Sequence, residues 1–300
     1  ELDPAYIASY FRRGLAYHNT GKLELAIADY TTFIEGNPKY AIAYRNRAIA
    51  YDDSDKQLPA IADYTKAIEL DPKDSFAYYR RGWVYDEMDN PALAIADYTK
   101  AIEINPADEA SYFRRGLAYH KTGKLELAIL DYTTTIKLDP ANAVAYRNRA
   151  MAHDDSDKPL PAIADYTKSI EIDPEDSLAY YRRGMVLDKL DNLALAIADY
   201  TKAIELDPKS TGSYLRRGLD LDQQGETKKA IGDYTTFIEV NPDIAFGFYR
   251  RGLAHQRLGE FDKAISDFTN VITLEPENGE AYYRRAVALK ENRQKKEARL

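Results

Sequence analysis

The hydrophobic pattern of residues 7–40 divides into two halves, each with the spacing of a helix. Tyr10, Gly14 and Tyr17 lie at positions i, i+4 and i+7, which places them on one helix face. The second half carries a wider apolar stripe that must be buried on both sides, made by Leu23, Ala26, Ile27, Tyr30, Phe33 and Ile34. Gly21 stands between the halves and is a residue type that readily ends a helix. The pattern predicts two antiparallel helices joined by a short turn.

This pattern returns along the chain with a period of 34 residues. Nine of the 13 prolines follow that period, at positions 4, 38, 72, 106, 140, 174, 208, 242 and 276. A period of this size is typical of solenoids, in which each repeat packs on its neighbours. We therefore expect an all-α solenoid that forms one quasi-linear array. Its parts are residues 1–6 as the tail of a preceding unit, eight repeats (7–40, 41–74, 75–108, 109–142, 143–176, 177–210, 211–244 and 245–278), and residues 279–300 as a C-terminal partial unit or capping helix.

Several places of the repeat, counted from Ile7 as place one, keep one residue type. Place eight is Gly or Ala and place twenty is Ala in all eight repeats, so helix axes can approach closely there. Places four and twenty-four are Tyr except for Phe248 and Phe268, and these rings fill the adjoining space. The turn between the helices holds Gly or, in four repeats, an aspartate that tolerates the left-handed conformation: Asp55, Asp89, Asp157 and Asp191.

These features resemble the tetratricopeptide repeat family. The 34-residue length, the aromatic–Gly–Tyr series of the first helix, the Ala–Tyr pair of the second and the closing Pro all match its pattern. The resemblance covers nearly the whole chain. It implies a right-handed superhelix of helix-turn-helix units, whose first helices line a concave groove that binds proteins or peptides.

One departure from the family's pattern occurs in every repeat. Place seven, usually Leu in the family, is always Arg: Arg13, Arg47, Arg81, Arg115, Arg149, Arg183, Arg217 and Arg251. Place twenty-three is always Asp: Asp29, Asp63, Asp97, Asp131, Asp165, Asp199, Asp233 and Asp267. We predict an Arg–Asp ladder along the solenoid, with the Arg stems packed between helices and each guanidinium on a carboxylate.

A longer repetition lies above the 34-residue one. Residues 1–102 align without gaps on residues 103–204, and 77 of the 102 positions are identical. Duplication of a three-repeat block duplicates any binding pocket within it. The irregular third block, residues 205–300, favours a natural origin over an engineered repeat array.

Composition and charge narrow the class of function. The chain has 41 Lys and Arg residues against 49 Asp and Glu, a formal charge of -8, which argues against a nucleic-acid binder. No apolar run approaches the ~18 residues of a membrane span. The absence of cysteine excludes disulfides and a thiol nucleophile and suits the cytoplasm and the bacterial periplasm alike, with the cytoplasm slightly favoured. The first residues resemble the end of a repeat, so we interpret the chain as an excised segment.

The sequence holds no pattern typical of catalysis. The four His residues lack zinc-ligand spacing, and no glycine-rich phosphate loop or nucleophile elbow is present. Asp52-Asp53-Ser54-Asp55 and its copy at residues 154–157 resemble a calcium loop but lack its central Gly and closing Glu, so we interpret both as turns. We expect no enzyme, no cofactor and no metal.

The candidate binding surface is the groove that the resemblance implies. The first helices present aromatic and Arg residues at places five and six, apolar residues at place nine, and an acidic margin at places twelve and thirteen. Such a surface suits an extended or helical peptide, because aromatic anchors supply affinity and Arg reads carboxylate or carbonyl groups. The candidate peptide-binding residues are Phe11, Arg12, Arg45, Asn46, Tyr79, Arg80, Trp83, Phe113, Arg114, Arg147, Asn148, Tyr181, Arg182 and Tyr249.

Structural roles compete with this interpretation. Place-nine residues such as Leu15 and Ile49 can pack against neighbouring helices, and the place-six Arg residues can form salt bridges between repeats. A chaperone-tail receptor of the same family would need a five-residue carboxylate clamp. Only Asn46 with Arg80, and Asn148 with Arg182, match that clamp, so this subclass is disfavoured.

Two functions of different classes remain open at this stage. The leading one is a non-enzymatic adaptor that binds a protein or peptide in the groove. The alternative is a structural protein whose solenoid ends associate into homo-oligomers, because open ends of a solenoid expose apolar helix faces.

Overall fold

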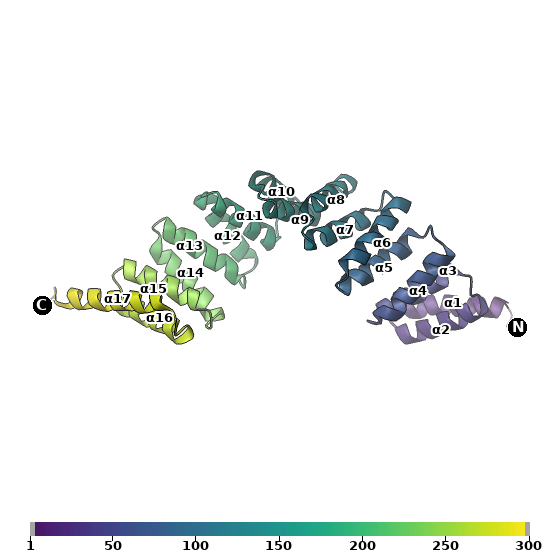
Figure 1. Cartoon of the computed structure of the whole chain (residues 1–300), viewed down its shortest axis with the longest axis horizontal. Coiled ribbons are helices and arrows are strands. Elements are labelled where there is room, and N and C mark those ends of the chain that lie inside the picture. Colours follow the sequence, from purple (N-terminus) through teal and green to yellow (C-terminus); the bar gives the residue numbers. More distant parts are fainter. Residues whose placement is uncertain (1–3, 298–300) are drawn as a thin grey trace. The chain divides into compact units, whose positions relative to one another are not determined.

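The computed structural model describes residues 4–297, and these residues form seventeen α-helices and no strand (Figure 1). The prediction of an all-α repeat solenoid is confirmed. Residues 1–3 of the expected tail and residues 298–300 of the expected cap lie outside the described range. The helices are α1 (Pro4–Asn19), α2 (Leu23–Gly36), α3 (Ala41–Asp52), α4 (Gln57–Leu70), α5 (Ser75–Glu87), α6 (Pro91–Ile104), α7 (Glu109–Lys121), α8 (Leu125–Leu138), α9 (Ala143–Asp155), α10 (Pro159–Ile172), α11 (Ser177–Lys189), α12 (Leu193–Leu206), α13 (Thr211–Gln223), α14 (Thr227–Val240), α15 (Ala245–Arg257), α16 (Phe261–Leu274) and α17 (Gly279–Glu297).

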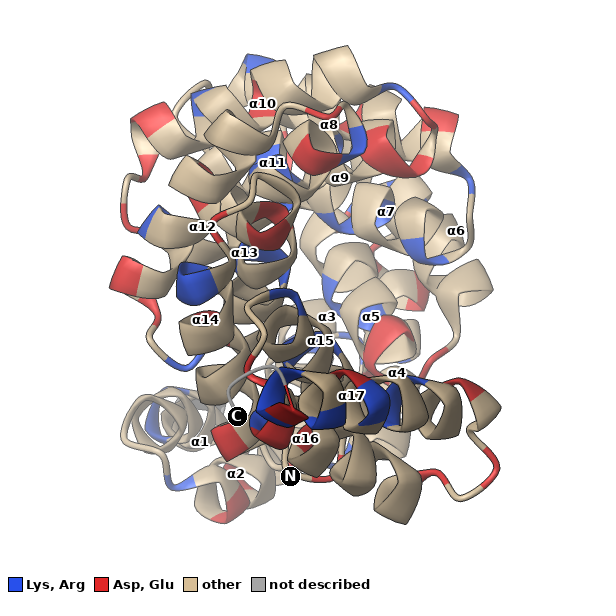
Figure 2. Ribbon diagram, turned by 90° about the vertical axis from the view of Figure 1, so that its left-hand side faces the viewer, with Lys and Arg blue, Asp and Glu red and all other residues tan. Residues whose placement is uncertain are grey.

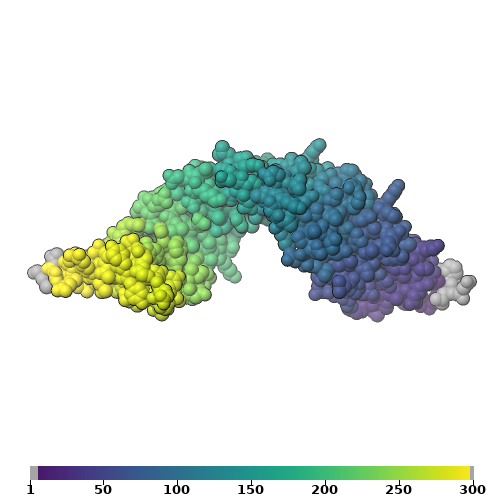
Figure 3. Space-filling view, in the orientation of Figure 1, coloured from purple at the N-terminus to yellow at the C-terminus, as the bar shows by residue number. Residues whose placement is uncertain are grey.

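The chain divides into two compact units, residues 1–156 and residues 157–300. The dividing point falls in the turn of the fifth repeat, between α9 and α10. Within each unit the colours of Figure 3 follow chain order, as expected where a repeat packs on its sequence neighbours. Each unit is therefore a solenoid segment of its own.

Inside each unit the helices form two layers. Seven odd-numbered helices each pack against the even-numbered helix that follows: α1, α3, α5 and α7 in the first unit, and α11, α13 and α15 in the second. The odd-numbered helices of the first unit also contact one another in series from α1 to α9. In the second unit α11 likewise contacts α13. The place-twenty Ala and the place-twenty-four ring of each pair are fully buried, as Ala94 and Tyr98 are between α5 and α6. Within each unit, the first helices of successive repeats thus share one layer.

The turns confirm the sequence interpretation of their Gly and Asp residues. Gly21 has a φ of 73°, and Asp55 adopts the same left-handed conformation with a φ of 59°. The acidic segment around Asp55 is accordingly a helix-helix turn. At place eight, a Cβ on Gly82 would lie 3.0 Å from the Tyr98 ring, which shows how closely the two helices approach.

The last helix differs from the others in its surface. Figure 2 shows basic residues along α17, and only Ala281 and Ala288 of this helix are buried. No described helix has the length and apolar content that a membrane crossing requires.

Candidate functional site

The predicted Arg–Asp ladder is present in both units. Arg81 donates two hydrogen bonds to Asp97, from Nε to Oδ2 at 2.7 Å and from Nη2 to Oδ1 at 2.8 Å. The same bidentate geometry holds Arg13, Arg47, Arg115, Arg183, Arg217 and Arg251 on the aspartates sixteen residues further on. The aspartates are buried, and the Arg81 side chain is 16% exposed. The ladder prediction is confirmed for these seven pairs.

From the second repeat onward, the place-seven Arg also has a further partner that was not predicted. Nη1 of Arg81 donates a hydrogen bond of 2.9 Å to the hydroxyl oxygen of Thr65, which belongs to the preceding repeat. Equivalent bonds reach the preceding repeat from Arg47, Arg115, Arg149, Arg183, Arg217 and Arg251. Thr at place twenty-five of the repeat was the available signal. The ladder therefore ties each repeat to the one before it.

The place-six Arg residues serve mainly to join neighbouring repeats. Arg80 contacts the carboxylate of Asp52 in the preceding repeat at 2.6 Å. Arg216 and Arg250 reach the equivalent aspartates, Asp188 and Asp222, at 3.5 Å and 3.9 Å. The alternative of salt bridges between repeats is thus confirmed at these three positions.

Arg114 is different because it lies on the single tryptophan. Its guanidinium carbon is 3.4 Å from the centroid of the Trp83 ring, well within the range of a cation–π contact. Among the described residues Arg114 forms no ion pair with Asp86, which occupies the place of Asp52. Tyr79 completes the cluster with its ring centroid 6.5 Å from that of Trp83. Three candidate residues therefore form one aromatic–Arg cluster on α5 and α7.

The place-five aromatic residues are half-buried and pack on the second helix of their own repeat. The rings of Tyr79, Phe113 and Tyr181 each lie 6.0 Å from the buried Tyr at place twenty-four. Tyr249 contacts Phe268 in the same way at 6.1 Å, and Phe11 lies 5.0 Å from Phe33. These residues contribute to the core and present only part of each ring to a ligand.

The remaining candidates occupy varied surroundings. Arg12 is exposed, and Asn46, Arg147 and Arg182 are half-buried on α3, α9 and α11. Nη1 of Arg45 donates a 2.7 Å hydrogen bond to Asp74, the N-cap of α5. The Asn148 amide donates to the Val144 carbonyl within its own helix at 2.8 Å.

At place nine, the apolar residues pack beside the cores of their repeats, as the structural alternative expects. Leu15 and Ile49 show this in the first two repeats. Trp83 is the aromatic member of this series, and the guanidinium of Arg114 stacks on its ring.

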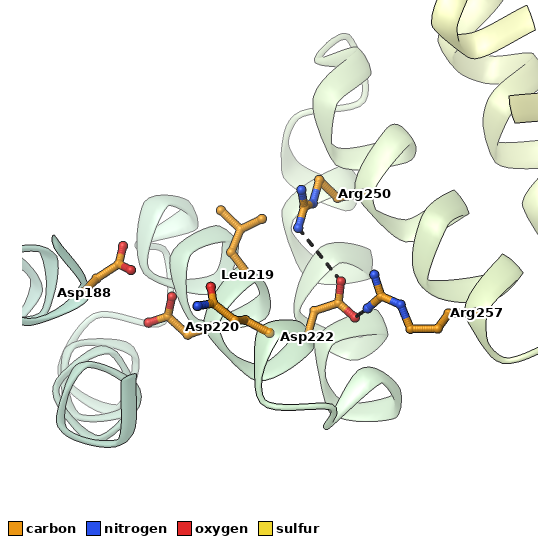
Figure 4. Close-up of a pocket in the computed structure, with 7 residues that line it drawn as sticks. Asp188, Leu219, Asp220, Asp222, Arg250 and Arg257 are labelled. Atoms are coloured by element: carbon orange, nitrogen blue, oxygen red, sulfur yellow. Dashed lines mark hydrogen bonds and ion pairs between the residues drawn. The ribbon is translucent and has the colours of Figure 1, made fainter. Parts of the chain in front are cut away.

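A pocket of about 590 Å³ opens among three first helices of the second unit, α11, α13 and α15 (Figure 4). Its lining residues are Asp188, Leu219, Asp220, Asp222, Gln223, Arg250 and Arg257. Arg257 and Arg250 both contact Asp222, whereas the carboxylates of Asp188 and Asp220 face each other. Asp188 and Asp222 occupy place twelve, in the predicted acidic margin. Asp220 occupies place ten and was not predicted.

Asp220 has the most perturbed carboxyl group of this pocket. Burial, together with the neighbouring charge of Asp188, raises the pKa of Asp220 to about 7. Arg216 opposes this shift because its positive charge favours the ionised carboxylate. The pair therefore changes its charge near neutral pH.

Comparisons with known proteins identify the repeat. Three family models, each described as tetratricopeptide repeat (TPR), match residues 75–108, 177–210 and 245–278, residues 97–129, and residues 7–40 and 41–74. No curated protein matches the chain.

Solved structures give the same fold. YrrB, described as a TPR protein with an unusual peptide-binding site, is 25% identical, with a TM-score of 0.57 over 63% of this chain and 97% of its own. Residues 41 to the end of MamA from Desulfovibrio magneticus RS-1 are 20% identical, with a TM-score of 0.54 over 57% of this chain and 96% of their own.

The C-terminal part of a TPR repeat-containing protein from Cytophaga hutchinsonii is 18% identical, with a TM-score of 0.61 over 91% of this chain and 98% of its own. The family models together match more than half of the residues. The chain therefore belongs to the tetratricopeptide repeat family and is a multi-repeat protein of the protein-interaction type.

Proposed function

We propose that this chain is a non-enzymatic adaptor that binds a peptide segment of a partner protein on its layer of first helices. The observation that carries the proposal is the stacking of Arg114 on Trp83, beside Tyr79. The peptide-binding site named for YrrB, a TPR protein of related fold, supports the same class of function.

The chemistry of the cluster favours an extended peptide with carboxylate or carbonyl groups. Arg114 is held over the indole ring instead of on a carboxylate of the preceding repeat, so its planar N–H fork is available to a ligand oxygen. Trp and Tyr supply rigid contact area at low entropic cost, and such residues dominate binding energy at interfaces. One peptide can therefore gain affinity from the rings and orientation from the Arg.

Two substitutions test the proposal with residues that the chain already uses at the same places. Trp83→Met copies Met185, and Arg114→Asn copies Asn148, so both variants should fold. Peptides selected from a random library on the unmodified protein should bind the double variant at least about tenfold more weakly, a loss of about 1.4 kcal/mol. The measurement is the Kd from fluorescence anisotropy.

Lys100→Ala on α6 is the control, because this exposed residue lies on a second helix. Its affinity for the selected peptides should match that of the unmodified protein. Equal affinity of the double variant and the unmodified protein would place the site elsewhere.

Self-association is the second candidate. Tyr282, Tyr283 and Leu289 of α17 are exposed, which favours contact between copies through this helix. Light scattering over a concentration series should then show a rising mass, and a constant monomer mass would exclude it.

A further inference from the structure

Asp220 stands where the other repeats have a small apolar residue. Place ten is Ala or Val in the seven other full repeats: Ala16, Ala50, Val84, Ala118, Ala152, Val186 and Ala254. From the second repeat onward this place is buried, and Asp220 is only 2% exposed. Burial of a carboxyl group costs free energy that Ala at the same place avoids. Strongly perturbed carboxyl groups of this kind cluster at functional sites.

The contacts around Asp220 leave one of its oxygens without a donor group. Oδ2 of Asp220 accepts no hydrogen bond from the described residues, and the hydrogen bond that Asp220 shares with Asp188 requires a proton on one of the two carboxyl groups. The carboxylate faces Asp188, whose own cationic neighbour is Arg216 at 3.5 Å. The phenol oxygen of Tyr200 on α12 is also buried without a hydrogen bond in the described structure.

The local charges favour a positively charged occupant. Arg250 and Arg257 are both engaged by Asp222, and Arg216 is on the Asp188 side. One carboxylate, that of Asp220, thus has no cation of its own. An ammonium or guanidinium group supplies the charge and donors that this oxygen lacks.

We propose that this pocket of the second unit binds one cationic side chain, Lys or Arg, of a peptide segment. Asp220 and Asp188 hold the charged group, and Leu219 contacts its aliphatic stem. The pocket volume of about 590 Å³ accommodates such a side chain, and its lining residues come from the layer of first helices. This inference rests on the proposed function, peptide binding by first helices, and adds a preference for a basic residue at the first helices of the second unit.

The proposal implies a definite pH dependence. The cation binds the doubly ionised Asp188–Asp220 pair, so binding releases a proton near neutral pH. The cations near the pair are Arg216 of α13 and Arg250 and Arg257 of α15. Burial raises the pKa of Tyr200 of α12. The Asp188–Asp220 pair is thus the group that governs the change, and affinity should rise about tenfold from pH 6 to pH 8.

The first experiment uses small probes that mimic the two side chains. n-Butylammonium and propylguanidinium are titrated into the full chain, and the ¹³C carboxyl shifts of Asp188 and Asp220 are followed by NMR. We expect saturable binding with a Kd on the order of millimolar. Butane-1-ol, which has the stem without the charge, should not shift these signals.

Asp220→Asn keeps the shape and removes the charge, and Asp220→Ala restores the residue of the other repeats. Either change should weaken probe binding at least tenfold, measured on backbone amides of α13. Asp243→Ala removes an exposed carboxylate of the same unit and should leave binding unchanged. Equal binding by the Asp220 variants would overturn the proposal. Binding of Mg²⁺ or Ca²⁺ at Asp220, without binding of either organic cation, would overturn it in favour of a metal site.

A library experiment separates this inference from the proposed function. Peptides selected on the unmodified chain should be enriched in Lys or Arg, and selection on Asp220→Asn should lose that enrichment. Peptides captured without any basic preference would sink the pocket proposal and leave the adaptor function standing. Failure to capture any peptide, with probe binding intact, would instead count against the adaptor function.

Discussion

Two buried aspartates in this protein, Asp97 and Asp220, show how neighbours decide the consequence of burial. Asp97 in the first unit is 5% exposed and accepts two hydrogen bonds from Arg81. Asp220 in the second unit is 2% exposed, yet one of its oxygens has no hydrogen-bond partner among the described residues. The two residues are similarly buried, but Asp97 has a complete ion pair and Asp220 does not.

The difference follows from where the two residues lie in the repeat. Place twenty-three faces the place-seven Arg of the same repeat, so the carboxylate is matched by a bidentate guanidinium. Place ten faces the preceding repeat, where Asp220 meets the carboxylate of Asp188. A buried charge with a matched partner belongs to the scaffold, whereas Asp220 faces a like charge in a pocket, which supports the cation site proposed there.

The largest expected effect comes from breaking a complete pair. Arg81→Leu removes the guanidinium but leaves Asp97 buried, and an uncompensated buried charge costs roughly 3–5 kcal/mol. Thermal unfolding should show a clear drop in Tm. An unchanged or higher Tm would show that the ladder does not stabilise the fold.

Arg13→Leu is the matched control at the first rung. The Arg13 side chain is 56% exposed, and among the described residues its hydrogen bonds go to Asp29 and to no Thr. The loss of stability should therefore be smaller than for Arg81→Leu, because solvent screens the exposed pair. Equal losses of stability would show that the exposure of the Arg side chain does not change how much an Arg–Asp pair stabilises the fold.

The next largest expected effect is a gain in stability instead of a loss. Asp220→Ala should stabilise the protein at pH 8 by roughly 2–4 kcal/mol, since the pKa of Asp220 is raised from an ordinary value of 3.8 to about 7. The unfolded chain releases this proton near pH 4 and the folded chain near pH 7, so the penalty grows between these values and is complete above them.

Urea unfolding of the Asp220→Ala variant and the unmodified protein at pH 4 and pH 8 checks this sign. The stabilisation should be nearly absent at pH 4 and full at pH 8. A variant that is less stable than the unmodified protein at pH 8 would contradict the comparison of Asp220 with Asp97.

The smallest expected effect is the loss of stability on removal of one hydrogen bond between repeats, that of Arg81 with Thr65. Thr65→Val keeps the volume near Arg81 but removes the hydroxyl that accepts from Nη1. The expected loss is about 1–2 kcal/mol, as for a hydrogen bond to a charged group. Urea unfolding measures this loss. Thr32→Val on α2 is the control, because the Thr32 hydroxyl donates only to the Ala28 carbonyl of its own helix.

Periodicity made the fold and part of the site predictable. The Arg–Asp ladder followed from two places that never vary, and the left-handed turn at Asp55 followed from its alternation with Gly. Trp83 was singled out because it is unique in the chain, and the structure adds its stacking with Arg114. Binding of a peptide by these candidate residues stays a prediction.

Asp220 shows why part of the candidate site could not be predicted from the sequence pattern. Place ten lies outside the places expected to face the groove and outside the predicted stripe of places four, eight and eleven. A comparison of place ten across the repeats would have revealed the exception, since every other full repeat has Ala or Val there. The partners of Asp220 come from different repeats, so their approach depends on how those repeats pack.

The sequence by itself determined the helix pairs, their turns and the pairing of Arg with Asp inside a repeat, because these depend on residues close in the chain and on a 34-residue period. Only the tertiary structure decided which place-six Arg residues pair with the preceding repeat and which one stacks on Trp83. It also decided that Asp188 and Asp220 face one pocket. These contacts depend on a few ångströms of packing between repeats. The periodic sequence pattern does not distinguish a repeat that forms such a contact from one that does not.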